Sequence, residues 1–181
     1  MIGSSAGGLH ALKRLFLGLD SSFNLPVIIV QHLSADADNY LINILNDLGK
    51  LKVKEADEKE EPAKGYAYLA PPNYHLLFEP DRTFTLTIDE RVNYARPSID
   101  VLFETAAEAF KDRLIGIIFT GANSDGSKGL KKIKEFGGLT IVQDPDTAEV
   151  DSMPRAAIQT ASVDHIATIE EIAVILNNLS E

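Results

Sequence analysis

The first 32 residues contain the pattern that decides the fold: MIGSSAGGLHALKRLF (residues 1–16) is followed by PVIIVQH (residues 26–32). In the first stretch, two apolar residues lead into a loop of small residues, and an amphipathic helix is predicted over residues 7–19. The second stretch is a short, continuous β-branched run, which is typical of a buried parallel strand. We therefore expect a strand, a glycine-rich turn, a helix and a parallel strand in this order.

Strands and helices continue to alternate along the rest of the chain. Further helices are predicted over residues 38–49, 96–110, 130–138 and 152–161 and from residue 168 onward, and further strands over residues 51–57, 66–70, 114–121, 139–143 and 164–168. Residues 75–88 hold two strand-like runs joined by Glu79-Pro80-Asp81-Arg82, which indicates a β-hairpin. The pattern predicts an α/β fold: a doubly wound, mainly parallel sheet with helices on both faces and an inserted β-hairpin.

Residues that favour helix ends lie at most of these boundaries. Polar side chains that can cap a first turn, and glycines that can end a last turn, stand where the apolar periodicity starts and stops. The expected start and stop residues are Asp38 or Asn39, Gly49, Ser98, Gly137, Pro154 and the capping-box pair Thr168 and Glu171.

The composition narrows the possible functions. The chain has 181 residues, of which 45% are hydrophobic and 24% charged, and this suits one globular domain over residues 1–181. The formal net charge of −10 disfavours contact with phosphate backbones, so we expect no nucleic-acid partner. The absence of cysteine excludes disulfides and thiolate catalysis and suits a cytoplasmic protein. No apolar run approaches the roughly 20 residues of a membrane span, so no membrane insertion is expected.

The loop Gly3-Ser4-Ser5-Ala6-Gly7 matches the pattern G-x-S-x-G. Between a strand and a helix, this pattern is typical of a nucleophile elbow, here with Ser5 as the nucleophile. A dinucleotide fingerprint would need glycine in place of Ser5, and the G-x-x-x-x-G-K-[ST] phosphate loop is absent. Ser4 is the rival nucleophile, and a plain tight turn is the structural alternative.

A serine nucleophile needs a base and a carboxylate that orients the base. Among the four histidines, His32 alone ends a predicted parallel strand at its carboxyl end, where such sheets bind ligands. Asp125 follows the most hydrophobic predicted strand. A buried histidine bonded to the backbone and a simple Asp-Gly turn are the alternatives for these two residues. The other histidines and aspartates weighed for these roles are His10, His75, His165, Asp36 and Asp144.

Several long motifs together resemble the catalytic domain of the CheB protein-glutamate methylesterases of bacterial chemotaxis, and they span essentially the whole chain. The motifs are IGSSAGGLHAL (residues 2–12), VIIVQHLS (27–34), LAPPNYHL (69–76), RPSIDVLF (96–103), FTGANSDGSKGL (119–130) and GGLTIVQDPDTAEVDSMPRAAI (137–158). The family loop often reads T-G-M-G-x-D-G, whereas this chain has Ala122 and Asn123 in place of Met-Gly.

The resemblance implies a Ser–His–Asp triad that falls on Ser5, His32 and Asp125, and an oxyanion hole of backbone N–H groups near Ala6 and Ala122. It implies hydrolysis of glutamate methyl esters, and in some members deamidation of glutamines, on the cytoplasmic helices of methylated chemoreceptors. It implies no metal and no cofactor. Since family members usually carry a receiver domain, and similar domains are fused to a methyltransferase, we expect one of these domains in the full-length protein.

Two other classes of function remain open at this point. The glycine-rich loop could serve a nucleotide or sugar-phosphate binding domain, or the chain could be an inactive interaction domain of a larger signalling protein. Met153 and Arg155 are weaker candidates for lining the cleft, because SMPR is equally typical of a helix start.

Overall fold

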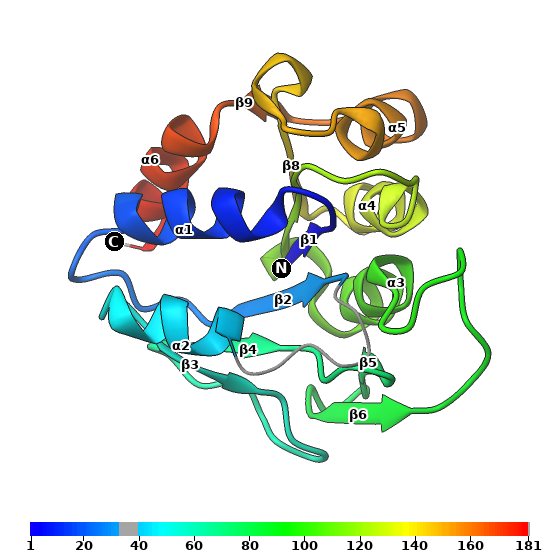
Figure 1. The fold of residues 1–181 in the computed structure, drawn as a ribbon. Coiled ribbons are helices and arrows are strands. Elements are labelled where there is room, and N and C mark those ends of the chain that lie inside the picture. The colour runs from blue at the N-terminus through cyan, green and yellow to red at the C-terminus, as the bar shows by residue number, and fades with distance from the viewer. Residues whose placement is uncertain (33–39, 181) are drawn as a thin grey trace.

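The computed structural model describes residues 1–32 and 40–180. Its centre is a seven-stranded sheet with the order β3-β4-β2-β1-β7-β8-β9, and all of its neighbouring strands are parallel (Figure 1). The strands are β1 (Ile2–Ser4), β2 (Val27–Gln31), β3 (Lys52–Glu55), β4 (Tyr66–Leu69), β7 (Ile115–Ile118), β8 (Leu139–Gln143) and β9 (His165–Ala167). The predicted α/β class with a parallel sheet is confirmed.

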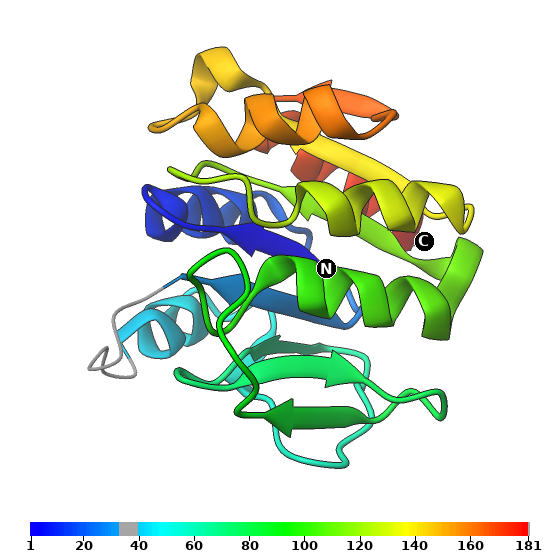
Figure 2. The same cartoon turned by 90° about the vertical axis from the view of Figure 1, so that its right-hand side faces the viewer.

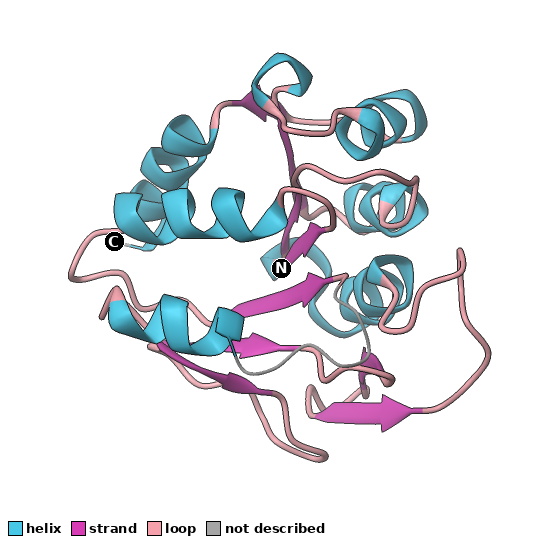
Figure 3. Ribbon diagram, in the orientation of Figure 1, coloured by secondary structure: helices cyan, strands magenta, loops and turns pink. Residues whose placement is uncertain are grey.

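Helices cover both faces of the sheet, as predicted (Figures 1 and 3). One face carries α1 (Gly8–Gly18), α2 (Tyr40–Asp47) and α6 (Ile169–Ser180). The other face carries α3 (Ile99–Phe110), α4 (Ser127–Glu135) and α5 (Ser152–Thr160), which lie side by side in Figure 2. This two-sided cover explains why β2 is buried along its whole length and reads as an uninterrupted apolar run.

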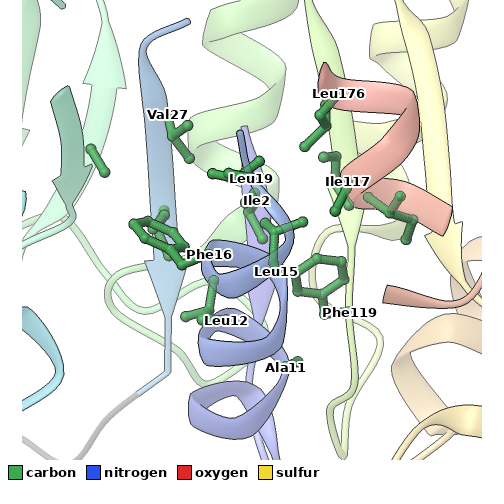
Figure 4. Close-up of a cluster of buried hydrophobic side chains, with 14 of the residues drawn as sticks. Ile2, Ala11, Leu12, Leu15, Phe16, Leu19, Val27, Ile117, Phe119 and Leu176 are labelled. Atoms are coloured by element: carbon green, nitrogen blue, oxygen red, sulfur yellow. The ribbon is translucent and has the colours of Figure 1, made fainter. Parts of the chain in front are cut away.

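Each face of the sheet has its own hydrophobic core. Under α1 and α6, the side chains of Leu12, Phe16 and Phe119 pack around Ile2 of the central strand (Figure 4). Under α3, α4 and α5, Phe103 and neighbouring side chains form the second core. Full burial of such a side chain contributes roughly 1.5–3 kcal/mol, so the helical periodicity of the sequence translates directly into stability.

The predicted hairpin is present, but it forms a small sheet of its own. Strands β5 (His75–Phe78) and β6 (Phe84–Thr87) pair antiparallel and are separate from the seven-stranded sheet. The hairpin lies beside α3 (Figures 1 and 2), where the amide of Phe78 donates a hydrogen bond to Thr105 Oγ1. The connection from β6 to α3 passes the carboxyl end of the main sheet, where it lies beside Ser5 and His32.

Helix ends follow the predicted signals with small shifts. Ser98 caps α3, and Thr168 and Glu171 form the predicted capping box of α6. Helix α4 begins at Ser127, three residues before the predicted start, because Gly126 adopts a left-handed conformation that starts the helix there. Helix α5 begins two residues before Pro154, which needs no amide partner in a first turn. The predicted caps Asp38 and Asn39 lie outside the described residues.

The order of the strands places a crevice beside β1. This strand lies between β2 and β7, and the chain visits β2 early but reaches β7 only after the hairpin and α3. In open α/β sheets, ligands bind where the strand order reverses, beyond the carboxyl ends of the strands. The loops that follow β1, β2 and β7 meet there, and they carry Ser5, His32 and Asp125 respectively.

Candidate active site

The N-terminus of α3 holds the Asp125 carboxylate, which is fully buried. Oδ2 accepts a hydrogen bond from the backbone N–H of Ile99 (2.7 Å), and Oδ1 accepts bonds from the N–H of Asp100 (3.1 Å) and from Ser98 Oγ (2.8 Å). The first turn of a helix has unpaired N–H groups and a partial positive charge, so it stabilises an anion. These hydrogen bonds therefore keep the carboxylate ionised and fix its orientation.

His32 follows β2 and contacts this carboxylate. Its Nε2 atom lies 2.9 Å from Asp125 Oδ2, and only 13% of the histidine side chain is exposed. Although burial alone would raise it, the pKa of Asp125 is held below its ordinary value by hydrogen bonds from His32, Ile99 and other donors. Because an ionised carboxylate can only accept, Nε2 carries the proton and Nδ1 presents a lone pair.

Asn123 contacts both of these residues. Its Oδ1 accepts a hydrogen bond from the backbone N–H of Asp125 (3.0 Å), and its Nδ2 lies 3.4 Å from His32 Nδ1. The second contact is long for a hydrogen bond, so Asn123 engages the Nδ1 lone pair only weakly.

Ser5 lies directly after β1, on the wall of a pocket that it shares with His32 and Asn123. Its backbone N–H donates to the carbonyl of Thr120 (3.0 Å), and within residues 1–32 and 40–180 its hydroxyl group makes no hydrogen bond to His32 or to another residue. The pocket is open to solvent and has a volume of about 250 Å³, below the 300–1,000 Å³ range typical of small-molecule sites. It suits a small group presented from outside.

The turn that carries Ser5 differs from the predicted elbow in one respect. The left-handed residue is Gly7 (φ 80°), two positions after the serine, and Ser5 is not among the residues with positive φ. A Cβ atom at Gly7 would lie 2.8 Å from Glu149 Cβ and 3.0 Å from Thr120 Oγ1. The left-handed conformation and the close packing against these loops therefore both require glycine at position 7.

Ser4, the rival nucleophile, points away from the pocket. It is fully buried, and its hydroxyl donates to Gln31 Oε1 at 2.6 Å. Gln31 in turn donates through Nε2 to the carbonyls of Ser5 (2.8 Å) and His32 (3.0 Å). Gln31 thus ties the two candidate catalytic loops together, a role that the sequence analysis did not predict.

The sequence of the chain has clear relatives. The profile of the CheB methylesterase family matches residues 1–176. The chain belongs to the CheB methylesterase family. A relative from Leptospira interrogans, provisionally named protein-glutamate methylesterase/protein-glutamine glutaminase, is 55% identical over 181 residues, which are 100% of this chain and 94% of the relative. A Clostridium acetobutylicum protein-glutamate methylesterase/protein-glutamine glutaminase is 35% identical over 173 residues, which are 96% of this chain but 50% of that protein.

The fold comparison agrees with the family assignment. The crystal structure of the Thermotoga maritima CheB methylesterase catalytic domain is similar with a TM-score of 0.93 and 34% sequence identity, over 98% of this chain and 96% of that one. The chain therefore spans about half of the longer CheB relatives and nearly all of a solved catalytic domain.

Two backbone N–H groups flank the pocket of this CheB-family domain. Ala6 follows Ser5, Ala122 precedes Asn123, and both alanines are exposed. In the described part of the chain, neither N–H donates to a backbone carbonyl. The loops that carry them are joined by Thr120, whose Oγ1 donates to Ala6 O (2.8 Å). Neither alanine is among the residues that line the pocket, although each is next to one that does, and the oxyanion role of their N–H groups stays a prediction.

The remaining wall of the pocket comes from the connection between β6 and α3, and consists of Arg91 and residues 93–97. Sequence analysis did not place this segment at the site. The signal was weak, because only Arg96 and Pro97 of this segment belong to a family motif, RPSIDVLF, and the hairpin contributes no strand to the main sheet.

The other histidines and aspartates considered as base or carboxylate do not line the pocket where the structure describes them. His10 is exposed and 3.3 Å from Glu149, and His75 is buried with Nε2 bonded to the carbonyl of Glu90. Asp144 accepts from the amide of Asp146 as a turn residue. His165 is exposed at the start of β9, and Asp36 lies outside the described residues.

Met153 and Arg155 differ in their relation to the site. Met153 is buried, and its Cε would lie 2.6 Å from a Cβ at Gly121, so it packs behind the Ser5 loop. Arg155 pairs with Asp151 and Asp146 on the surface.

Neither a metal site nor a membrane span is found in the described ranges. Among these residues, no group of three or more His, Cys, Asp or Glu side chains is placed to hold a metal ion. Within the same ranges, no helix combines the length and apolar character required to cross a membrane.

Proposed function

We propose that the chain is the catalytic domain of a serine hydrolase that demethylates glutamate methyl esters, and deamidates glutamines, on chemoreceptor helices. The observation that carries the proposal is the 2.9 Å contact between His32 and the buried Asp125 carboxylate, opening into the pocket that Ser5 lines. Family membership and the names of the relatives support the same activity.

In the proposed first step, the Ser5 hydroxyl attacks the ester carbonyl and His32 Nδ1 takes its proton. The arrangement supports this role for Nδ1 because Nε2 is engaged by Asp125. The carboxylate stabilises the imidazolium that forms without taking its proton. The tetrahedral oxyanion would lie between the N–H groups of Ala6 and Ala122.

In the second half of the reaction, the imidazolium returns its proton to the leaving group. With a methyl ester the leaving group is methanol, and with a glutamine side chain it is ammonia. Water then attacks the acyl-enzyme with His32 again as base, which releases a glutamate carboxylate and restores Ser5.

The proposed substrate is a side chain on a methylated receptor helix in the cytoplasm. A pocket of about 250 Å³ suits an extended glutamyl ester better than a nucleotide, which disfavours the nucleotide and sugar-phosphate alternative. His32 at the pocket, paired with the buried and ionised Asp125, is the base and carboxylate arrangement that a serine hydrolase uses, which disfavours an inactive interaction domain. A receiver or methyltransferase domain in the full-length protein remains a prediction.

Replacement of Ser5 tests the proposal. Ser5→Ala should abolish methanol release from methylated receptor membranes and prevent covalent labelling by a fluorophosphonate. Ser21→Ala, a serine exposed beyond the opposite end of α1, is the matched control and should behave as the wild type. Methanol release by Ser5→Ala at the wild-type rate would refute the proposed nucleophile, and labelling of wild type at a different residue would do the same.

A further inference from the structure

The connection between β6 and α3 carries a turn with an unusual residue at its tip. In this turn, residues 92–95, here called the rim turn, Val92 and Ala95 exchange two backbone hydrogen bonds of 3.1 and 2.9 Å. The central residues Asn93 and Tyr94 both have positive φ, 51° and 64°. Turns with two such central residues prefer the sequence Asn-Gly. Tyr94 therefore occupies a position where glycine would be free of strain.

Asn93 attaches the rim turn to the candidate active site. Its Nδ2 group donates to Asp100 Oδ2 (2.9 Å) and to Asp125 Oδ1 (3.0 Å). Both acceptors are buried carboxylates at the start of α3 and α4. The side chain of Asn93 thus holds the tip of the turn at a set position relative to His32, and Tyr94 is carried with it.

Tyr94 projects into solvent at the mouth of the pocket. It is 95% exposed, yet it lines the same pocket as Ser5 and His32. Val92, beside it on the turn, is also partly exposed. A strained, solvent-exposed aromatic residue contributes nothing to the core, so its presence beside an active site points to a functional constraint. Tyrosine is enriched at the energetically important positions of protein interfaces.

Arg91 adds a positive charge next to this ring. It lines the pocket, and its Nη1 donates a long hydrogen bond to the carbonyl of Tyr94 (3.4 Å). None of the ion pairs among residues 1–32 and 40–180 includes Arg91. Arg96 also lines the pocket, but its guanidinium donates to the carbonyls of Ile88 and Asp89. The nearby acidic residues Asp89 and Glu90 do not line the pocket.

We infer that Tyr94 and Arg91 form a recognition element for an acidic helical segment of the substrate protein. The ring packs on the helix beside the reacting side chain, and the guanidinium pairs with a carboxylate about one helical turn away, where side chains three or four residues apart are neighbours. Since the chain has a net charge of −10, an acidic segment needs a local cation to approach. This inference rests on the proposed function and adds the residues that select the flanking sequence.

Two substitutions test the inference, each with a matched control. Tyr94→Gly removes the ring and relieves the strained backbone, and Arg91→Gln removes the charge. Phe136→Ala and Arg113→Gln alter an aromatic and a cationic residue after α4 and α3, at the opposite end of the sheet. The substrate is a soluble helical peptide with one glutamate methyl ester flanked by carboxylates. The readouts are kcat/KM for this peptide, the rate of Ser5 labelling by a fluorophosphonate, and the melting temperature.

Tyr94→Gly should lower kcat/KM for the peptide about tenfold, through KM, while the labelling rate stays within about twofold of wild type. Its melting temperature should not fall, since glycine suits the turn. Arg91→Gln should lower kcat/KM by about fivefold at low salt and less at high salt. The controls should match the wild type.

Wild-type kcat/KM in both variants, or equal losses in labelling and peptide hydrolysis, would overturn the inference. A wild-type protein that neither reacts with the fluorophosphonate nor hydrolyses the peptide would overturn the proposed function itself.

Discussion

His32 directs its Nε2 atom, and not its Nδ1 atom, toward Asp125, at a distance of 2.9 Å. In the general Ser–His–Asp template the carboxylate contacts Nδ1 and the base is Nε2. In the proposed mechanism the two ring nitrogens exchange these roles, because Nε2 is the atom that contacts the carboxylate. The tautomer with the proton on Nε2 is the one that the ionised Asp125 favours.

Asp125→Asn should lower kcat by about 10³–10⁴-fold, because the amide no longer favours the Nε2-protonated tautomer. The amide nitrogen would also face the N–H of Ile99, so part of the hydrogen bonding at the start of α3 is lost. The measurement is steady-state methanol release, with circular dichroism to check that the variant is folded. A folded variant with a loss below tenfold would show that Asp125 does not orient the base.

The low pKa of Asp125 predicts a pH dependence of stability. Hydrogen bonds hold the pKa in the folded state below its ordinary value, against the effect of burial. The carboxylate therefore contributes stability above about pH 4, near the pKa of the unfolded chain, and this contribution is lost as the pH falls through the lower folded-state pKa. The difference in free energy of unfolding between wild type and Asp125→Asn should shrink below pH 4. Urea denaturation at pH 6.5, 4.5 and 3.5 measures it, and a constant difference would contradict the prediction.

The sequence predicted the fold well because its signals are local. The apolar run of residues 27–31 and the helical spacing of residues 9–19 each specify one element, and each became that element. Parallel strands then bring their carboxyl ends to one edge, so the convergence of the loops after β1, β2 and β7 followed from the same pattern. The shifted start of α4 is the exception, since a left-handed glycine is not visible as periodicity.

The surroundings of the site could not be predicted in the same way. Gln31, Asn93 and Ser98 contact the candidate residues only because distant segments approach in three dimensions. Nothing in the spacing of these residues along the chain indicates such contacts. The conformation of Tyr94 was even harder to predict from the sequence. Turns with two central residues of positive φ favour glycine at this position, so a tyrosine there gives no signal of such a turn.

Ala122→Pro tests the proposed oxyanion hole, because proline has no backbone N–H. The loss of one such donor should lower kcat by about 10²–10³-fold. Ala122→Gly keeps the N–H and is the matched control, with activity close to that of wild type. The measurement is kcat for methanol release, with labelling of Ser5 to confirm that the nucleophile is accessible. Equal activity in the two variants would remove Ala122 from the mechanism.

Ser98 and Ser127 give a paired test of how buried hydroxyl groups are used at this site. Ser98 Oγ caps α3 and donates to Asp125 Oδ1 at 2.8 Å, whereas Ser127 Oγ is buried with no hydrogen-bond partner in the described part of the chain. Ser98→Ala should therefore lower the free energy of unfolding by about 1–2 kcal/mol and reduce kcat. Ser127→Ala should leave stability within about 0.5 kcal/mol of wild type or raise it, since it removes an unpaired polar group.

Urea denaturation at neutral pH and methanol release measure both effects of this pair. The contrast between the two serines is the informative quantity, because each substitution removes one buried oxygen atom of the same kind close to a helix start. If Ser127→Ala destabilised the protein as much as Ser98→Ala, the hydrogen bond from Ser98 to Asp125 would make no specific contribution to stability. The Ser98 hydroxyl would then not be one of the groups that hold the carboxylate in place for His32, and the backbone N–H groups of Ile99 and Asp100 alone would do so.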